Sequence, residues 1–284
     1  VISRAEQTEI DEGRAVDDCV LLDCRHLGRD LIMERLSQIH ELALDFANVD
    51  ILEEPVPIRP GMHYQMGGIK SDVHGATRIH GLYACGECAC ISLHGGNRLG
   101  ANSLLETVTF GRRTGAAAAV YAQGKAFKNV PEGARTKDEE IIKQIFAREQ
   151  NSDTPAKIRW EMGTTMNQRA GVFRTEEGLA EASSKIKELK ERYQRAPVQD
   201  KGRVFNTNLL AVLELGFMLD CAETIVASAL DRKESRGAHF RLDYSKRDDE
   251  NWLKHTLAFQ APEGPRIDYL PVTITKWQPE ERKY

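Results

Sequence analysis

The sequence predicts a mixed fold, in which an α/β portion is followed by an α-helical domain of three helices and a small C-terminal α+β segment. Glycines are crowded between residues 63 and 123 and separate short apolar runs, as is typical of strands, turns and helices in alternation. Apolar residues recur at helical spacing between residues 141 and 230. After Ser235 the sequence is polar and loop-like, and it ends in a strand-like run at residues 269–274.

The composition is that of a globular protein and excludes several classes. The 284 residues include 39 Lys and Arg against 43 Asp and Glu, a formal net charge of −4, and 41% are hydrophobic. This length allows about two domains, and the weak charge argues against a dedicated nucleic-acid-binding protein. No run approaches ~20 uncharged apolar residues, so we expect neither a membrane-spanning helix nor a signal peptide. Six cysteines are too few for a disulfide scaffold and are expected to be reduced thiols.

The first segment is predicted to end in one helix. Five apolar residues recur at steps that place them on one helix face: Ile32, Leu36, Ile39, Ala43 and Phe46. Asp30 is a candidate cap, and the helix must stop before Pro55. The prolines at positions 55, 57 and 60 predict a crossing between two domains.

In the glycine-rich region a buried strand is predicted ahead of a long helix. Residues 82–85 are apolar and lie between Gly81 and Gly86, which predicts a buried strand with Cys85 facing the core. Residues 103–122 predict a helix, and residues 125–136 predict a polar linker.

The later apolar stripes predict three antiparallel helices. A short stripe covers residues 141–146, and a longer one covers residues 179–193. Residues 209–230 are apolar on most sides, which predicts the central, buried helix of the three.

The densest cluster of unusual residues spans positions 86–104, where the predicted strand leads through a glycine-rich loop into the helix. Glu87 would follow the strand directly, where it can accept hydrogen bonds from sugar or ribityl hydroxyls. The helix N-terminus offers unpaired N–H groups and a partial positive charge to a planar cofactor. An ordinary strand–loop–helix connection explains the same residues, and no G-x-G-x-x-G fingerprint is present, so the residues alone leave both interpretations open.

Three further features have competing interpretations. Cys85, Cys88 and Cys90 form a C-x-x-C-x-C pattern, but a fourth ligand at standard spacing is absent, so we expect no metal. Arg98 lies among small residues and can present its guanidinium to a carboxylate, although the residues alone slightly favour an ordinary surface arginine on a loop. His63, taken alone, is more simply a hydrogen-bonding loop residue.

Two blocks of this sequence resemble the flavoprotein subunits of succinate dehydrogenase and fumarate reductase. Residues 60–69 resemble their H-Y-x-M-G-G-I segment, and residues 86–104 resemble their G-E-C … L-H-G-x-N-R-L-G-x-N-S-L block. Residues 23–28 look like the family's D-x-R-H-L-G, and residues 232–239 are similar to its later text. The resemblance runs from about Asp23 to the C-terminus.

The resemblance implies an enzyme that interconverts succinate and fumarate by hydride transfer to or from FAD. It implies that His63 and Arg98 hold the dicarboxylate and polarise fumarate. Glu87 would bind flavin hydroxyls, and the backbone at residues 102–104 would face the flavin N1/O2 edge. The resemblance thus implies these cofactor-binding residues: Tyr64, Glu87, Arg98, Asn102, Ser103 and Leu104. The implied partners are an iron–sulfur subunit and, through that complex, a membrane anchor, with a peripheral location on the cytoplasmic face of the inner membrane or in the cytoplasm.

The family's dinucleotide-binding half, its covalent flavin histidine, its Thr–Glu substrate pair and its general-acid arginine have no match here. The chain also opens at Val1, so we expect a fragment or processed product that matches the C-terminal half of the subunit and that alone binds no FAD stably. The expected parts are the end of a capping domain (residues 1–54), part of the FAD-binding α/β domain (55–128), a helical domain (129–234) and a C-terminal segment (235–284).

Two other functions remain open. L-aspartate oxidases share the same block, but they typically carry Cys where Met66 stands and tend to end soon after the text that matches residues 242–244, whereas this chain continues through residues 247–257. A non-catalytic half-enzyme that serves in assembly or binding is the second alternative. It predicts that loss of Arg98 leaves activity unchanged.

Overall fold

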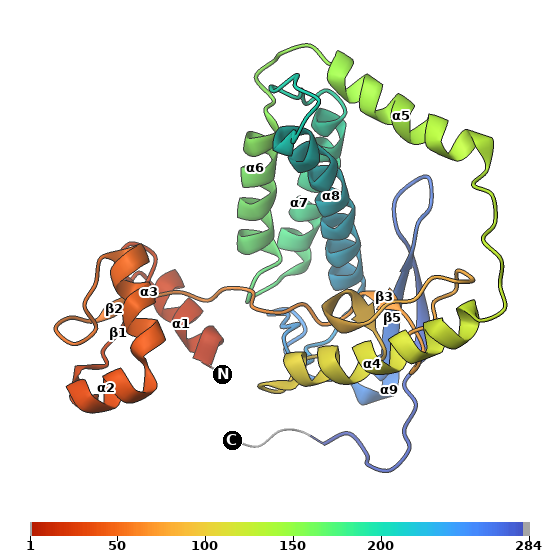
Figure 1. Cartoon of the computed structure of the whole chain (residues 1–284). Coiled ribbons are helices and arrows are strands. Elements are labelled where there is room, and N and C mark those ends of the chain that lie inside the picture. The colour runs from red at the N-terminus through yellow and green to blue at the C-terminus, as the bar shows by residue number, and fades with distance from the viewer. Residues whose placement is uncertain (1, 281–284) are drawn as a thin grey trace. The chain divides into compact units, whose positions relative to one another are not determined.

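The computed structural model describes residues 2–280, which divide into two units with the boundary in the sequence between Gln65 and Met66 (Figure 1). Each unit is described by itself. No helix among the described residues is long and apolar enough to cross a membrane.

The first unit contains the helices α1 (Ile2–Asp11), α2 (Arg29–Arg35) and α3 (Ser37–Ala47), with a 3-10 turn at Arg25–Leu27. The strands β1 (Val20–Leu22) and β2 (Val56–Ile58) pair antiparallel, so that Val20 lies opposite Ile58. Pro57 occupies the middle of β2, which a strand at a sheet edge tolerates because one side makes no ladder bonds. The buried residues of this unit form one cluster: Cys24, Ile32, Ala43, Ile51 and Val56.

The prediction of a single helix over residues 32–46 is wrong, because Leu36 interrupts it. Leu36 has φ −126° and ψ 18°, outside the helical region, and it joins α2 to α3. Its side chain packs against the core cluster, so the break turns both helices toward the same apolar residues. Asp30 is not the cap either, because Gly28 occupies that position and Asp30 lies in the first turn.

The second unit begins with the strands β3 (Ile69–Lys70) and β4 (Ala89–Cys90), which pair in parallel. The long helix α4 (Asn102–Ala122) follows, and it confirms the helix predicted at residues 103–122. The predicted strand at residues 82–85 is wrong, because Tyr83 makes only a single antiparallel bridge to Ala76. Positive φ angles at Gly81 and Gly86 turn the chain on both sides of this run, which leaves it too short to pair as a strand.

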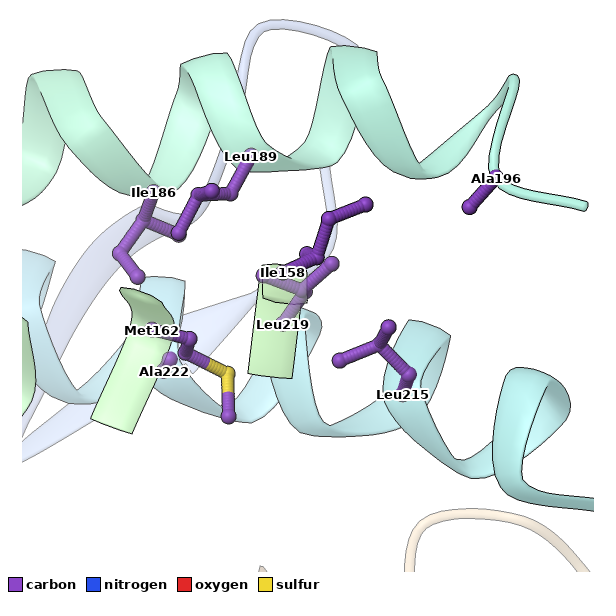
Figure 2. Close-up of a cluster of buried hydrophobic side chains, with 8 residues drawn as sticks. All are labelled: Ile158, Met162, Ile186, Leu189, Ala196, Leu215, Leu219 and Ala222. Atoms are coloured by element: carbon purple, nitrogen blue, oxygen red, sulfur yellow. The ribbon is translucent and has the colours of Figure 1, made fainter. Parts of the chain in front are cut away.

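The helices α6 (Pro155–Arg169), α7 (Glu176–Tyr193) and α8 (Thr207–Asp231) pack side by side (Figure 1). Each helix contacts the other two, and α7 packs most extensively against both neighbours, so the prediction of α8 as the central helix is wrong, although α8 is a member of the bundle. Figure 2 shows the core between them, where Ile158 and Met162 of α6 meet Ile186 and Leu189 of α7 and the α8 side chains. Burial of these side chains removes apolar surface from water, and each Å² of apolar surface buried stabilises the fold by roughly 25 cal/mol.

The stripe at residues 141–146 does form a helix, α5 (Glu132–Ala147), but α5 is not a member of this three-helix bundle. Its Ile145 packs against Val198 and against Val212 in the first part of α8, in a cluster separate from the three-helix core. The third bundle helix is α6. Only three of its residues are buried, so its apolar stripe is thin. The linker predicted at residues 125–136 is too long, since α5 begins at Glu132.

The C-terminal segment contains the short helix α9 (Asp249–Trp252) and an antiparallel hairpin of β5 (Lys254–Phe259) and β6 (Arg266–Pro271). The strand predicted at residues 269–274 corresponds to β6, but the prediction starts and ends three residues too late. The prediction of loops over the preceding residues is wrong at β5. The hairpin is tied to the end of α8, because the Tyr269 hydroxyl donates to Asp231 over 2.7 Å. This bond raises the pKa of Tyr269 to about 12.

Candidate active site

Arg98 lies in the loop that joins β4 to α4. Three residues of this loop have positive φ angles, namely Ser92, Gly95 and Ala101, so the backbone reverses direction repeatedly over a short distance. Arg98 itself is half-buried, and its Nη1 donates to the carbonyl oxygen of Leu99 over 3.0 Å. The loop is therefore a compact and irregular structure that holds a guanidinium near the start of α4.

The middle of the loop is fastened to a segment far along the chain. The backbone N–H of Ala238 donates to the carbonyl oxygen of Gly96 over 2.9 Å. A Cβ atom at Gly96 would lie 2.9 Å from the carbonyl oxygen of Arg236, so only glycine fits this contact. The structure thus brings together two blocks that carry the family resemblance, residues 86–104 and 232–239.

The start of the loop is fastened to α4 by a buried pair. His94 Nε2 lies 2.5 Å from Glu106 Oε2, and these side chains are 10% and 2% exposed. The pairing of His94 with Glu106 is not predicted by the sequence pattern. The signal that could have indicated a buried partner was Glu106, a charged residue among Leu104, Leu105 and Val108, one turn after the start of α4.

The N-terminus of α4 can face a hydrogen-bond acceptor. Ala101 occupies the cap position with φ +64° and has no side-chain oxygen to bond the first helical N–H groups. The N–H of Asn102 donates to Leu99 over 3.2 Å. Ser103 is half-buried and the Leu104 side chain is exposed. The first-turn N–H groups of a helix have no intrahelical acceptor and carry its positive dipole end, which suits an electron-rich ring.

Glu87 and the cysteines lie in and around a 3-10 turn, Gly86–Cys88. Glu87 is exposed and precedes β4. The prediction that Glu87 directly follows a strand is wrong, because residues 82–85 form only a single bridge. Cys85 is half-buried rather than in the core, and the Cys88 thiol donates to the Cys85 carbonyl oxygen over 3.4 Å. Within residues 2–280, no three His, Cys, Asp or Glu side chains converge as a metal site would require.

His63 and Tyr64 lie in the first unit, in a stretch without regular secondary structure; His63 is exposed and Tyr64 is half-buried. Glu87, Arg98 and the start of α4 lie in the second unit. The pairing of His63 with Arg98 across a dicarboxylate therefore stays a prediction.

A buried ionic network supports the segment that holds Gly96. Glu234 is fully buried and accepts hydrogen bonds from Arg232 over 2.5 Å and from Arg236 over 2.8 Å. Arg236 also donates to Asp249 of α9, and Arg232 also donates to the Lys254 carbonyl oxygen in β5. Glu234 thus links the segment at Gly96 to both α9 and the hairpin.

His239 is held neutral beside this network. Its Nδ1 accepts from Arg174 over 2.9 Å, and its Nε2 lies 3.1 Å from the Arg232 carbonyl oxygen, to which it donates. Burial, together with the positive charge of Arg174, lowers the pKa of His239 to about 4. The imidazole therefore acts as a fixed hydrogen-bond bridge at neutral pH.

The comparisons with known proteins agree with this architecture. Residues 1–104 match the FAD binding domain family, which places the chain among FAD-binding flavoproteins. Residues 159–284 match the fumarate reductase flavoprotein C-terminal family. The chain belongs to the family of fumarate reductase and succinate dehydrogenase flavoprotein subunits.

Individual relatives support this assignment. The chain is 49% identical to the fumarate reductase flavoprotein subunit of Haemophilus influenzae over 94% of its own length and 45% of that protein's. It is 41% identical to the succinate dehydrogenase flavoprotein subunit of Coxiella burnetii over 96% of its length and 48% of that protein's. A solved chain of E. coli quinol fumarate reductase matches with a TM-score of 0.93 and 43% identity, over 99% of this chain and 49% of that chain.

The structural match confirms the predicted fold class of a partial FAD-binding α/β domain with a helical domain and a small C-terminal piece. The chain spans about half the length of the curated relatives it matches.

Proposed function

We propose that this chain forms part of an FAD-dependent oxidoreductase that interconverts succinate and fumarate within a multi-subunit electron-transfer complex. The observation that carries the proposal is the Arg98 loop, which is fastened at His94 and Gly96 and leads directly into the uncapped start of α4. A fixed guanidinium beside a helix N-terminus suits a dianionic substrate held against an electron-rich ring.

The residues fit an FAD molecule in one respect that this structure provides. Ala101 leaves the first turn of α4 without a side-chain cap, so the N–H groups at Ser103 and Leu104 can bond the flavin N1/O2 edge. Asn102 would contribute to the same edge, and Glu87 and Tyr64 would bond the cofactor's hydroxyls and ring. When bound, FAD supplies the hydride chemistry at its N5 position.

The substrate would be gripped by His63 and Arg98. Two carboxylates at a fixed separation need two donor groups at a fixed separation, and an imidazole and a guanidinium provide them. Both groups stabilise negative charge that develops on the diacid as hydride is transferred, and such preorganised donors contribute about 10²–10³-fold in rate.

The proposed partners are an iron–sulfur subunit and, through it, a membrane anchor, with this chain peripheral to the cytoplasmic face of the inner membrane. The matched solved chain from a quinol fumarate reductase supports an electron-transfer partner. We further propose the division into a capping end (1–54), an FAD-domain portion (55–128), a helical domain (129–234) and a C-terminal segment (235–284).

The test is the Arg98→Ala variant in the flavin-loaded enzyme that contains this chain, assayed for fumarate reduction and succinate oxidation. We expect a loss of about 10²-fold or more in turnover with flavin content retained. Arg112→Ala is the matched control, because Arg112 is an exposed arginine on α4. Unchanged turnover in Arg98→Ala would contradict the proposal, and turnover of an amino acid without dicarboxylate turnover would favour an L-aspartate oxidase.

A further inference from the structure

We propose that His94 and Glu106 form a positioning pair for Arg98, which fixes where the guanidinium meets the substrate. The inference rests on the proposed function, because it deepens the role of Arg98. Neither residue would touch the diacid. Each acts through the loop, which is why they are positioning residues and not catalytic residues.

The burial of the pair indicates that it is a permanent part of the structure. Glu106 is 2% exposed, and a carboxylate that leaves water without a compensating partner costs several kcal/mol. The His94 imidazole provides that partner at 2.5 Å. Bonds to an ionised group are about twice as strong as neutral ones, so the pair resists opening when the rest of the loop moves.

The location of the pair connects it to Arg98. Glu106 belongs to the long helix α4. His94 lies in the first part of the loop, two residues after Ser92, where the backbone has a positive φ angle. Two residues later, Gly96 is bonded to Ala238. The backbone is therefore fixed at positions 94 and 96, and Arg98 follows after only one intervening residue.

The loop is also attached to β5, because Ser92 Oγ lies 2.8 Å from His255 Nε2, and the His94 pair adds a direct attachment to α4, the helix that Arg98 precedes. Loss of the His94 side chain removes the attachment between the loop and α4, while the bonds of Ser92 to His255 and of Gly96 to Ala238 remain. A displacement of about 1 Å at a substrate-binding group can cost 10²-fold in rate. The pair should thus govern dicarboxylate binding far more than flavin binding.

The experiment uses the flavin-loaded enzyme that contains this chain, with malonate as the probe, a dicarboxylate that cannot be oxidised to an alkene. Malonate binding is followed by the absorbance change of the bound flavin, and flavin content is measured separately. We expect His94→Ala to weaken malonate binding about 10-fold or more with flavin content retained. His94→Gln, whose amide can donate to Glu106, should restore binding to within about 3-fold of the parent.

Non-additivity distinguishes positioning from general damage. If His94 acts through Arg98, the double variant His94→Ala/Arg98→Ala should bind malonate as weakly as Arg98→Ala and no more weakly. Additive losses would overturn the inference, and so would full affinity in His94→Ala. Unchanged affinity in Arg98→Ala would instead contradict the proposed function, so the two failures are distinguishable.

Two further variants keep the test decisive. If His94→Ala does not fold, Glu106→Gln replaces a charge-assisted bond by a neutral one and should weaken malonate binding several-fold, whereas unchanged affinity overturns the inference. The matched control is His80→Asn. His80 is an exposed histidine beside Tyr121, which lies near the opposite end of α4, and its substitution should leave malonate affinity unchanged.

Discussion

Gly237 lies directly against Gly96, so that a methyl group built on Gly237 would overlap the Gly96 carbonyl. Gly237 also has φ +61°, a conformation in which only glycine avoids steric cost. The contact between these two glycines sets the shape of the loop that carries Arg98.

Substitution of Gly237 by alanine should therefore destabilise the protein and reduce activity together. The backbone conformation costs roughly 1–2 kcal/mol for a residue with a Cβ, and the overlap with Gly96 adds to it. The checks are the thermal unfolding midpoint and fumarate turnover. Gly163→Ala is the control, because a Cβ at this position in helix α6 meets nothing within 4 Å, and it should leave the midpoint unchanged or raise it. A stable, active Gly237→Ala variant would show that the contact is dispensable.

Protonation of His239 should make the protein less stable in mild acid. The folded-state pKa is about 4, whereas an unfolded histidine titrates near ~6.5. Between pH ~6.5 and about pH 4, His239 is protonated in the unfolded chain but neutral in the folded chain. The free energy of unfolding present at neutral pH therefore decreases as the pH falls through this range. The loss is up to about 3 kcal/mol.

The measurement is urea unfolding at pH 7 and at pH 4.5, followed by helical circular dichroism. His239→Gln keeps a donor for Arg232 and an acceptor for Arg174 but does not titrate. Its free energy of unfolding should fall less between the two pH values than that of the parent. Equal losses in both proteins would show that His239 does not contribute.

Replacement of Glu234 by glutamine should cost about 3 kcal/mol or more, because two arginines would then share a buried site without its carboxylate. The free energy of unfolding in urea measures the effect. Glu250→Gln provides the comparison, since Glu250 is an exposed residue of the adjacent helix α9 and should change stability by less than about 0.5 kcal/mol. If the two variants are equally stable, the buried network does not hold the C-terminal segment.

Truncation of Leu219 should have a large effect and truncation of Leu210 a small one, although both lie on α8. Leu219 is fully buried in the three-helix core, whereas Leu210 is 54% exposed. Leu219→Ala should lower the free energy of unfolding by about 2–5 kcal/mol, through lost burial and a residual cavity. Leu210→Ala should stay within about 1 kcal/mol. Similar losses at both positions would contradict the assignment of the core face.

The sequence predicts the helices that form from residues close to one another along the chain. Helix α7 follows from the spacing of its apolar stripe, α8 from a run that is apolar on most sides, and α4 from the uninterrupted stretch after the glycine-rich loop. Helix α6 was missed because its stripe is thin, yet Thr154 accepts from the Lys157 N–H and Pro155 occupies its first turn, so capping was the better signal there.

The tertiary part of the site was beyond local reasoning. Arg98 could be chosen from its small neighbours and the family resemblance, but its supports could not. His94 meets Glu106 only because the loop folds back on α4, and Gly96 meets Ala238 only in the folded second unit. The break at Leu36 arises in the same way, because packing against Ile32 and its neighbours overrides helix periodicity.

The bond from Ala238 to Gly96 also orders events during synthesis. A ribosome releases α4 and the arginine loop long before it releases the segment that fastens them, and contacts between distant parts of a chain form late. The nascent polypeptide therefore carries α4 with the Arg98 loop not yet bonded to Ala238 until most of the second unit has emerged. The final shape of the loop around Arg98 is therefore reached late in folding.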